Sequence, residues 1–179
     1  MITIKASKYS YGGIRPHSDA KFIIIHYSGV NGDTAEGEGN YFKSGNTRSA
    51  GAHFFIDRKG NIVKSVPLNR TAWSVGGAKY SDCRETGGGK YYKIATNSNS
   101  VSIELCDALD NKEPSEAQIK AVVRCIKYIR KHCKNANYLI RHFDVNGKHC
   151  PANMCGSAEG NRRWLKFKAR VFSESGMDK

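Results

Sequence analysis

Residues 141–151 read RHFDVNGKHCP and hold a histidine, His142, and a cysteine, Cys150, eight positions apart. Imidazole nitrogen and thiolate sulfur suit zinc better than magnesium or calcium. Gly147 lets the backbone fold back, and Pro151 fixes it directly after the cysteine. Two ligands do not complete a tetrahedral site, so the stretch indicates a metal site only if a third donor comes from elsewhere in the chain. Without that donor, a core histidine and a buried thiol explain the same residues.

A third donor is available at His26, which follows the run FIII at residues 22–25. A continuous β-branched and aromatic run of this kind is typical of a buried strand in a covered sheet. Taken alone, a histidine at the end of such a strand is explained as a hydrogen-bonded core residue. Together with His142 and Cys150 it becomes the natural third ligand. Three protein ligands plus water is the composition of a catalytic zinc site.

A fourth protein ligand would instead make the zinc structural. Cys155 is open as that ligand, whereas His149 is adjacent to Cys150 and would be difficult to orient toward the same ion. The remaining cysteines are predicted to be reduced and apolar in character, because the chain is long enough to fold without disulfides and carries no export signal.

The order of predicted elements indicates a single α/β domain, in which a central mixed β-sheet is flanked by helices. Residues 1–20 are expected to form an N-terminal arm, residues 21–172 the catalytic domain, and residues 173–179 a linker-like tail. The elements are a short helix at 34–45, a hairpin of 52–57 and 61–66, a loop over the site at 76–98, strands at 100–106 and 138–140, an amphipathic helix after 115, and a basic helix at 159–172. Ser115 and Gln118 predict a capping box at the start of the amphipathic helix.

Glu104 lies inside the apolar strand SVSIELC at residues 100–106. A carboxylate there is costly unless it is paired, exposed in a cleft or used in chemistry. It is equally explained as the solvent-facing residue of an alternating strand, with Ile103 and Leu105 on the buried face. The residues alone leave both explanations open.

The chain carries 29 Lys and Arg against 16 Asp and Glu, a net charge of +13. Such a field attracts polyanions, whether nucleic acid, anionic lipid or an anionic cell wall. No nucleic-acid-binding motif accompanies the basic residues, so no nucleic-acid partner is expected. No apolar stretch approaches the roughly 20 residues of a membrane span, and the N-terminus lacks the apolar segment of a secretory signal. We therefore expect synthesis in the cytoplasm, without a signal peptide.

Four motifs, KFIIIHYSG, SAGAHFFIDRKGNIVKSVPLNRTAWSVGG, NSNSVSIELC and RHFDVNGKHCP, occur in this order. Together they resemble the zinc-dependent N-acetylmuramoyl-L-alanine amidases of the type-2 amidase family. That family includes phage endolysins and bacterial autolysins and is related to peptidoglycan recognition proteins. The resemblance runs from residue 20 to residue 165.

The resemblance implies that His26, His142 and Cys150 hold one Zn²⁺ per chain. It also implies that Glu104 activates the attacking water and that Lys148 stabilises the transition state. Some relatives use a tyrosine in the position that Ala52 occupies here, so in this chain the role falls to Glu104.

A weaker correspondence places His53 and Trp73 on the substrate groove. The usual strand glycine of the family is replaced by Ser102.

The implied reaction is hydrolysis of the amide between N-acetylmuramic acid and L-alanine in bacterial peptidoglycan. The expected partner is a Gram-positive wall with anionic polymers, which the protein would reach after release by host lysis machinery or from outside. Three alternatives remain: a recognition protein that binds peptidoglycan without cutting it, a nucleic-acid-binding protein, and a cysteine hydrolase built from Cys150 and a histidine.

Overall fold

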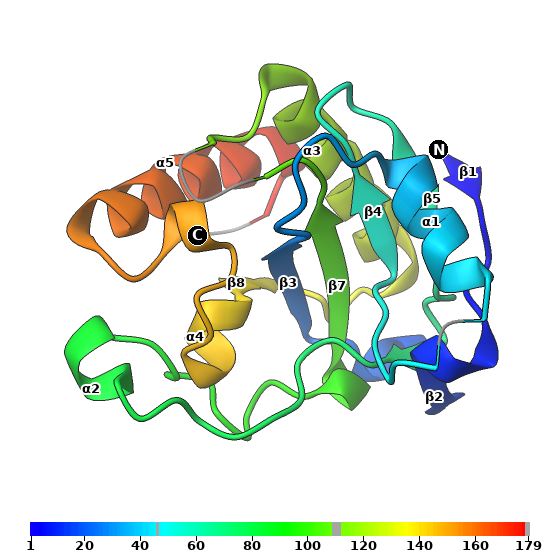
Figure 1. The fold of residues 1–179 in the computed structure, drawn as a ribbon, viewed down its shortest axis with the longest axis horizontal. Helices are drawn as coiled ribbons and strands as arrows, with labels where there is room; N and C mark the ends of the chain where they lie inside the picture. The colour runs from blue at the N-terminus through cyan, green and yellow to red at the C-terminus, as the bar shows by residue number, and fades with distance from the viewer. Residues whose placement is uncertain (46, 109–111, 178–179) are drawn as a thin grey trace.

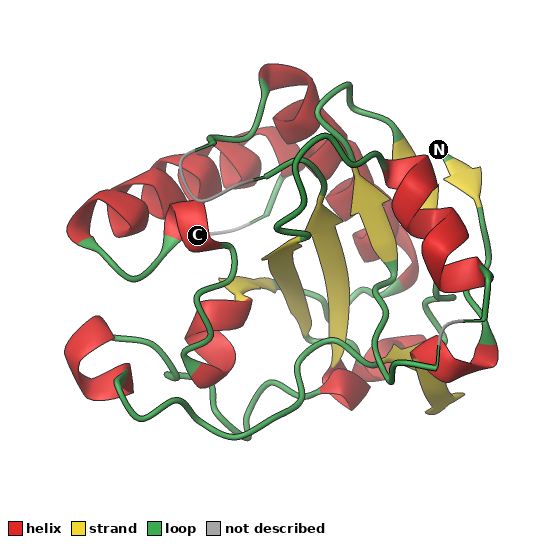
Figure 2. Cartoon of the chain, viewed as in Figure 1, coloured by secondary structure: helices red, strands yellow, loops and turns green. Residues whose placement is uncertain are grey.

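The computed structural model describes residues 1–45, 47–108 and 112–177. Its main sheet has six strands in the order β1-β5-β4-β7-β3-β8, and a second sheet pairs β2 with β6 (Figures 1 and 2). Strand β3 pairs in parallel with β7 on one side and with β8 on the other. Strand β4 is parallel to β7 and forms an antiparallel hairpin with β5. The sheet is therefore mixed and flanked by helices, which confirms the predicted α/β class.

The strands of the main sheet are β1 (Ile2–Thr3), β3 (Phe22–Tyr27), β4 (Phe54–Ile56), β5 (Ile62–Lys64), β7 (Ser100–Leu105) and β8 (Tyr138–Arg141), and those of the small sheet are β2 (Tyr11–Ile14) and β6 (Arg70–Ala72). The α-helices are α1 (Ala35–Lys43), α2 (Cys83–Thr86), α3 (Glu116–His132), α4 (His142–Asn146) and α5 (Ala158–Ser175). The predicted hairpin and the predicted strands and helices around it are confirmed, with ends shifted by a few residues.

The two faces of the sheet are covered differently. Ile23 and Ile25 of β3 face a core that α3 and α5 complete, where Ile126 and Trp164 are also buried. Alternate residues of a strand point to opposite faces, so Ile24 and His26 lie on the other side. Helix α1 packs on β4 and β5 over that second face, and α4 packs beside β3 and β8.

Strand register brings two of the predicted site residues together. His26 of β3 is directly opposite Glu104 of β7, and Ile25 is opposite Arg141 of β8, immediately before His142. Because β3, β7 and β8 are parallel, their carboxyl ends meet at one edge of the sheet, where ligands bind in open α/β sheets. The register therefore places His26, Glu104 and His142 at the same end of the sheet.

The predicted capping box at the start of α3 is only half formed. Ser115 Oγ accepts a hydrogen bond from the Gln118 N–H at 3.1 Å, as expected for the cap. The Gln118 side chain does not reach back to the cap; it is fully buried and donates to the carbonyl oxygens of Ile56 and Cys106. These carbonyl oxygens lie where β4 and β7 end. Because buried carbonyl oxygens need hydrogen-bond donors, the Gln118 amide bonds to them rather than to the backbone N–H of the cap residue.

Both ends of the chain are more structured than predicted. Ile2 and Thr3 extend the main sheet by pairing with Val63 and Lys64, and β2 pairs with β6, so residues 1–20 contribute strands to both sheets. Helix α5 continues to Ser175, three residues past its predicted end. Among the described residues, no helix is long and apolar enough to cross a membrane. All six cysteines carry free thiols.

Candidate metal and catalytic site

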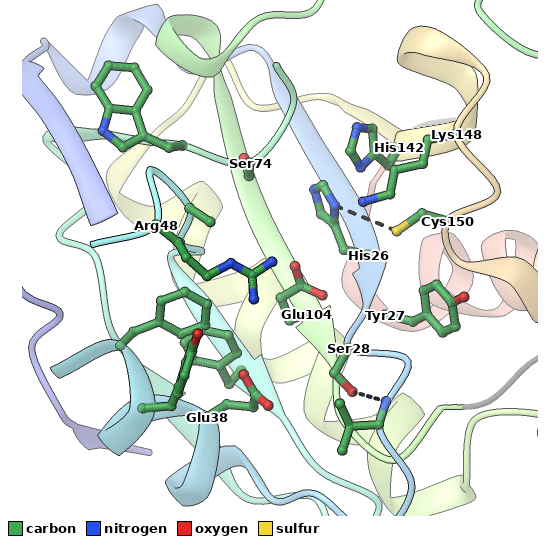
Figure 3. A pocket seen from close by; sticks show the side chains of 17 residues that line it. His26, Tyr27, Ser28, Glu38, Arg48, Ser74, Glu104, His142, Lys148 and Cys150 are labelled. Carbon is green, nitrogen blue, oxygen red and sulfur yellow. Dashed lines mark hydrogen bonds between the residues drawn. The ribbon is translucent and has the colours of Figure 1, made fainter. Parts of the chain in front are cut away.

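The three predicted metal ligands meet at the end of β3 (Figure 3). Their ligand atoms all lie within 4.8 Å of one another. Cys150 Sγ is 3.8 Å from His26 Nδ1, and the imidazole rings of His26 and His142 have centroids 4.7 Å apart. All three side chains are buried. Strand β3, the first residue of α4 and the loop after α4 therefore supply one compact set of donors.

The hydrogen bonding of these donors is incomplete in a way that a metal ion would resolve. Nε2 of His26 and both ring nitrogens of His142 are buried without a hydrogen-bond partner. Buried ring nitrogens of histidine normally have a hydrogen-bond partner. Burial lowers the pKa of His26 well below its usual value and that of His142 to about 3, so both rings are neutral, which is the form that binds metal.

Cys150 provides the third potential metal ligand, a thiol. Burial, together with the nearby Glu104, raises the pKa of the Cys150 thiol above its ordinary value. A thiol in that setting becomes a thiolate when a cation coordinates it. Two neutral imidazoles and one thiol therefore form a donor set that fits a borderline-soft divalent metal ion.

Neither candidate for a fourth ligand joins this group in the described part of the chain. The only cluster of His, Cys, Asp and Glu side chains at ligand distance there consists of His26, His142 and Cys150. His149 is turned outward, with Nε2 4.0 Å from a carboxylate oxygen of Asp82. The three-ligand composition therefore matches the predicted open site.

Glu104 faces the groove beside the donors, which decides between its two explanations in favour of the cleft (Figure 3). Its Oε2 atom is buried and has no hydrogen-bond partner. Desolvation, reinforced by the negative charge of Glu38, raises the pKa of Glu104 to about 8 against the opposing effect of Lys148. A strongly perturbed carboxyl group in a cleft is a candidate for proton transfer.

Lys148 is exposed and lines the same groove. Figure 3 shows its side chain extended toward His26 and Cys150, with the ammonium group facing the donor cluster. The structure thus brings all five of these predicted site residues, His26, Glu104, His142, Lys148 and Cys150, to one place.

The groove consists of two adjoining cavities of about 520 Å³ and about 650 Å³. Trp73, Ser74, His142 and Lys148 line both of them. Trp73 is 37% exposed, so its side chain is accessible from the groove. The predicted loop at 76–98 contributes residues 76–80 to the second cavity, while its residues 83–86 form α2.

The prediction that His53 lines the groove is corrected by the structure. His53 is fully buried and belongs to the lining of neither cavity. Its Nδ1 accepts from the Ser102 N–H at 3.1 Å, which leaves the Nε2 proton for the Arg70 carbonyl oxygen at 3.1 Å. Burial and the neighbouring Arg15 guanidinium lower the pKa of His53 to about 3, so the ring is a neutral bridge between β4, β6 and β7.

Sequence reasoning missed Glu38 and Arg48, which line the first cavity (Figure 3). Burial and the adjacent Asp33 raise the pKa of Glu38 to about 7. Both residues come from the segment between β3 and β4, and no local pattern marks them. Their place in the groove depends on how α1 packs on the hairpin.

Known proteins resemble this chain over most of its length. The family model described as N-acetylmuramoyl-L-alanine amidase (Amidase_2) matches residues 16–153. N-acetylmuramoyl-L-alanine amidase CwlL of Bacillus licheniformis is 27% identical over 153 residues, which is 83% of this chain and 40% of CwlL. N-acetylmuramoyl-L-alanine amidase XlyB of Bacillus subtilis is 30% identical over 159 residues, which is 87% of this chain and 43% of XlyB.

The solved structure of PlyL has the same fold, with a TM-score of 0.71 at 20% identity over 96% of each chain. The chain spans less than half the length of CwlL and XlyB. Because the family model covers residues 16–153, the chain belongs to the Amidase_2 family of N-acetylmuramoyl-L-alanine amidases.

Proposed function

We propose that this chain is a zinc-dependent amidase that hydrolyses the amide between N-acetylmuramic acid and L-alanine in bacterial peptidoglycan. One observation carries the proposal. Two neutral histidines and a cysteine converge with partnerless buried nitrogens, and a carboxyl group and an ammonium group face the same groove. Family membership supports amide hydrolysis as the reaction performed there.

In this proposal His26, His142 and Cys150 hold one Zn²⁺ per chain. Bound zinc supplies a Lewis acid that polarises a carbonyl group and lowers the pKa of water. The protein contributes the dry surroundings of the ligands, since all three are buried at the end of β3.

Glu104 serves as the general base and then as the general acid. Its carboxylate takes a proton from the attacking water and later delivers it to the nitrogen of the departing L-alanine. The pKa of Glu104, about 8 in the metal-free protein because of desolvation, supports this role, because it lies close to neutral pH, where a carboxyl group both accepts and returns a proton readily. Its partnerless Oε2 leaves an acceptor free for water.

Lys148 stabilises the negative charge that develops on the carbonyl oxygen as water attacks. Its exposed ammonium group lines both cavities, so it can reach a substrate lying across the site. Trp73 lies at the junction of the same cavities and would pack against the substrate.

The net charge of +13 supports binding to walls that carry anionic polymers, as many Gram-positive walls do. We therefore place the site of action at the cell wall. Attraction of this kind is screened by salt. Wall binding should fall steeply between low and high ionic strength, and binding that ignores salt would contradict this part of the proposal.

Digestion of purified Gram-positive peptidoglycan tests the reaction. New N-terminal alanine without new reducing sugar ends is the expected result. Cys150→Ser should lose zinc and activity together, while Cys155→Ser, a second buried cysteine, serves as the matched control and should retain both. Reducing ends would point to glycosidase chemistry. Wall binding without either product would favour the non-catalytic recognition protein.

A further inference from the structure

Asn146 is the last residue of α4 and is only 3% exposed, two positions before Lys148. Its Oδ1 accepts from the Lys148 backbone N–H at 3.0 Å. This is an Asx turn, in which an asparagine side chain bonds to the backbone two residues on. The side chain of Asn146 therefore fixes the backbone position of Lys148, to which the lysine side chain is attached.

The other polar groups of Asn146 connect α4 to residues 76–83. Its Nδ2 donates to the Gly76 carbonyl oxygen at 3.3 Å. Its own carbonyl oxygen accepts from the Tyr80 N–H at 2.8 Å and from the Cys83 thiol at 3.4 Å. One buried residue thus joins the loop that lines the second cavity to the turn that carries Lys148.

The surroundings of this turn leave it little freedom. The Cys150 N–H donates to the Lys148 carbonyl oxygen at 2.7 Å, so the backbone of Lys148 is bonded on both sides. Gly147 has φ of +89°, and a Cβ there would lie 2.2 Å from the Cys83 sulfur. Gly89 N–H further bonds the Phe143 carbonyl oxygen at 3.0 Å, which holds the later part of the same loop against α4.

We propose that Asn146 is a positioning residue for Lys148, which it aims into the groove by anchoring the turn to residues 76–83. The inference rests on the proposed function, because Lys148 acts on the substrate there. A flexible four-carbon side chain is effective in catalysis only when its backbone is fixed, and a misplacement of about 1 Å can cost about 100-fold in rate. Asn146 also lines the second cavity, where it is only 3% exposed, and in this proposal it acts through Lys148.

The test compares Asn146→Leu, which removes the turn bond at similar size, with Asn146→Ser, whose hydroxyl forms the same turn more weakly. We expect kcat on a soluble muramoyl peptide to fall in the order Asn, Ser, Leu, by about 10- to 100-fold for Leu, with KM changed much less. Zinc content should remain one per chain. Asn99→Leu is the matched control: it loses side-chain bonds to Thr96 and Ile94 at the opposite end of β7 from Glu104, so it should lower Tm and leave kcat unchanged.

Two readouts separate positioning from a general structural role. In a Lys148→Met background, Asn146→Leu should lower kcat by less than about twofold further, because residues that act as a unit are non-additive. Amide hydrogen exchange at Lys148 should accelerate at least about tenfold in Asn146→Leu, because its bonded partner is gone.

A full additional loss of kcat in the Lys148→Met background would overturn the proposal, as would unchanged kcat in Asn146→Leu or unchanged exchange at Lys148. If the Leu variant does not fold, the Ser variant carries the same comparisons. Absence of alanine release by the unmodified chain would instead overturn the proposed function, and the exchange measurement would still report on the turn.

Discussion

Glu104→Gln should make the zinc-free protein more stable while it abolishes most of the activity. The carboxyl group has a pKa of about 8 in the folded protein, against 4.5 as its ordinary value. Ionisation is therefore disfavoured on folding, so the carboxyl group lowers stability progressively as pH rises from about 4.5 to about 8. Gln has nearly the same shape and no charge to bury.

The magnitude follows from the pKa difference. Each pKa unit corresponds to about 1.4 kcal/mol, so at pH 7 the buried carboxyl costs the zinc-free protein about 3 kcal/mol relative to a neutral side chain. Near pH 4.5 the difference should almost vanish. For the zinc-loaded enzyme, loss of a general base should lower kcat by about 100- to 10,000-fold without changing zinc content.

Urea unfolding at pH 4.5 and pH 7 after chelation measures the stability, and alanine release measures kcat. Glu85→Gln, on the exposed surface of α2, is the matched control and should change neither. A stability gain that does not grow with pH would refute the account of Glu104 as a desolvated carboxyl group. A variant that keeps its kcat would refute its role as the base.

His53→Ala should lower the free energy of unfolding by about 2–4 kcal/mol in urea, because it leaves buried partners unpaired, and should leave KM unchanged. Trp73→Ala should do the opposite, raising KM in steady-state kinetics with little change in Tm. Gly147→Ala should destabilise by about 1–3 kcal/mol, because φ is +89° and Cβ meets the Cys83 sulfur. In thermal unfolding, the double variant Gly147→Ala/Cys83→Ala should recover only the part of the lost stability that comes from the clash with the sulfur. The part that comes from the positive φ should remain. Chelation should lower Tm, and zinc at about 1,000 times its Kd should restore about 4 kcal/mol. Relative to chelated His142→Gln, the chelated protein should lose stability as pH falls below about 6.5, because the imidazole of His142 stays neutral until about pH 3 when folded; the comparison cancels the opposite contribution of Glu104, and a stability difference between the two proteins that stays constant from pH 7 to pH 5 would contradict this.

Local sequence patterns were sufficient to predict the elements whose signal comes from neighbouring residues alone. The run at residues 22–25 indicated a covered strand, and Ile23, Ile24 and Ile25 are indeed fully buried in β3. The hairpin at β4–β5 was predictable from its flanking β-rich runs and from Gly60 at the turn, where φ is +83°. These signals need no knowledge of distant partners.

Features that depend on distant partners were not predictable in this way. Gln118 fits a capping box, yet its side chain is used by carbonyl oxygens of β4 and β7 that become its neighbours only on folding. The pairing of Ile2 and Thr3 with β5 depends on a strand that lies about 60 residues further along the chain and whose outer side is open to them.

The candidate site shows the same division. Chemistry and spacing suggested His26, His142 and Cys150, and the fold brings them together. His53 has the right residue type near the right motif, but the alternation along the strand predicted at residues 52–57 does not show whether its side chain lines a groove or lies in the interior. Only its contacts with Ser102 and Arg70 show that it is internal.

The most direct test of the account is hydrolysis of a synthetic N-acetylmuramoyl-L-alanyl peptide by the zinc-loaded protein in water enriched in ¹⁸O. We predict that mass spectrometry will find one ¹⁸O atom in the lactyl carboxylate of the released N-acetylmuramic acid and none in the released peptide. Label in the released peptide, or no hydrolysis by a protein that holds its zinc, would contradict the proposed reaction.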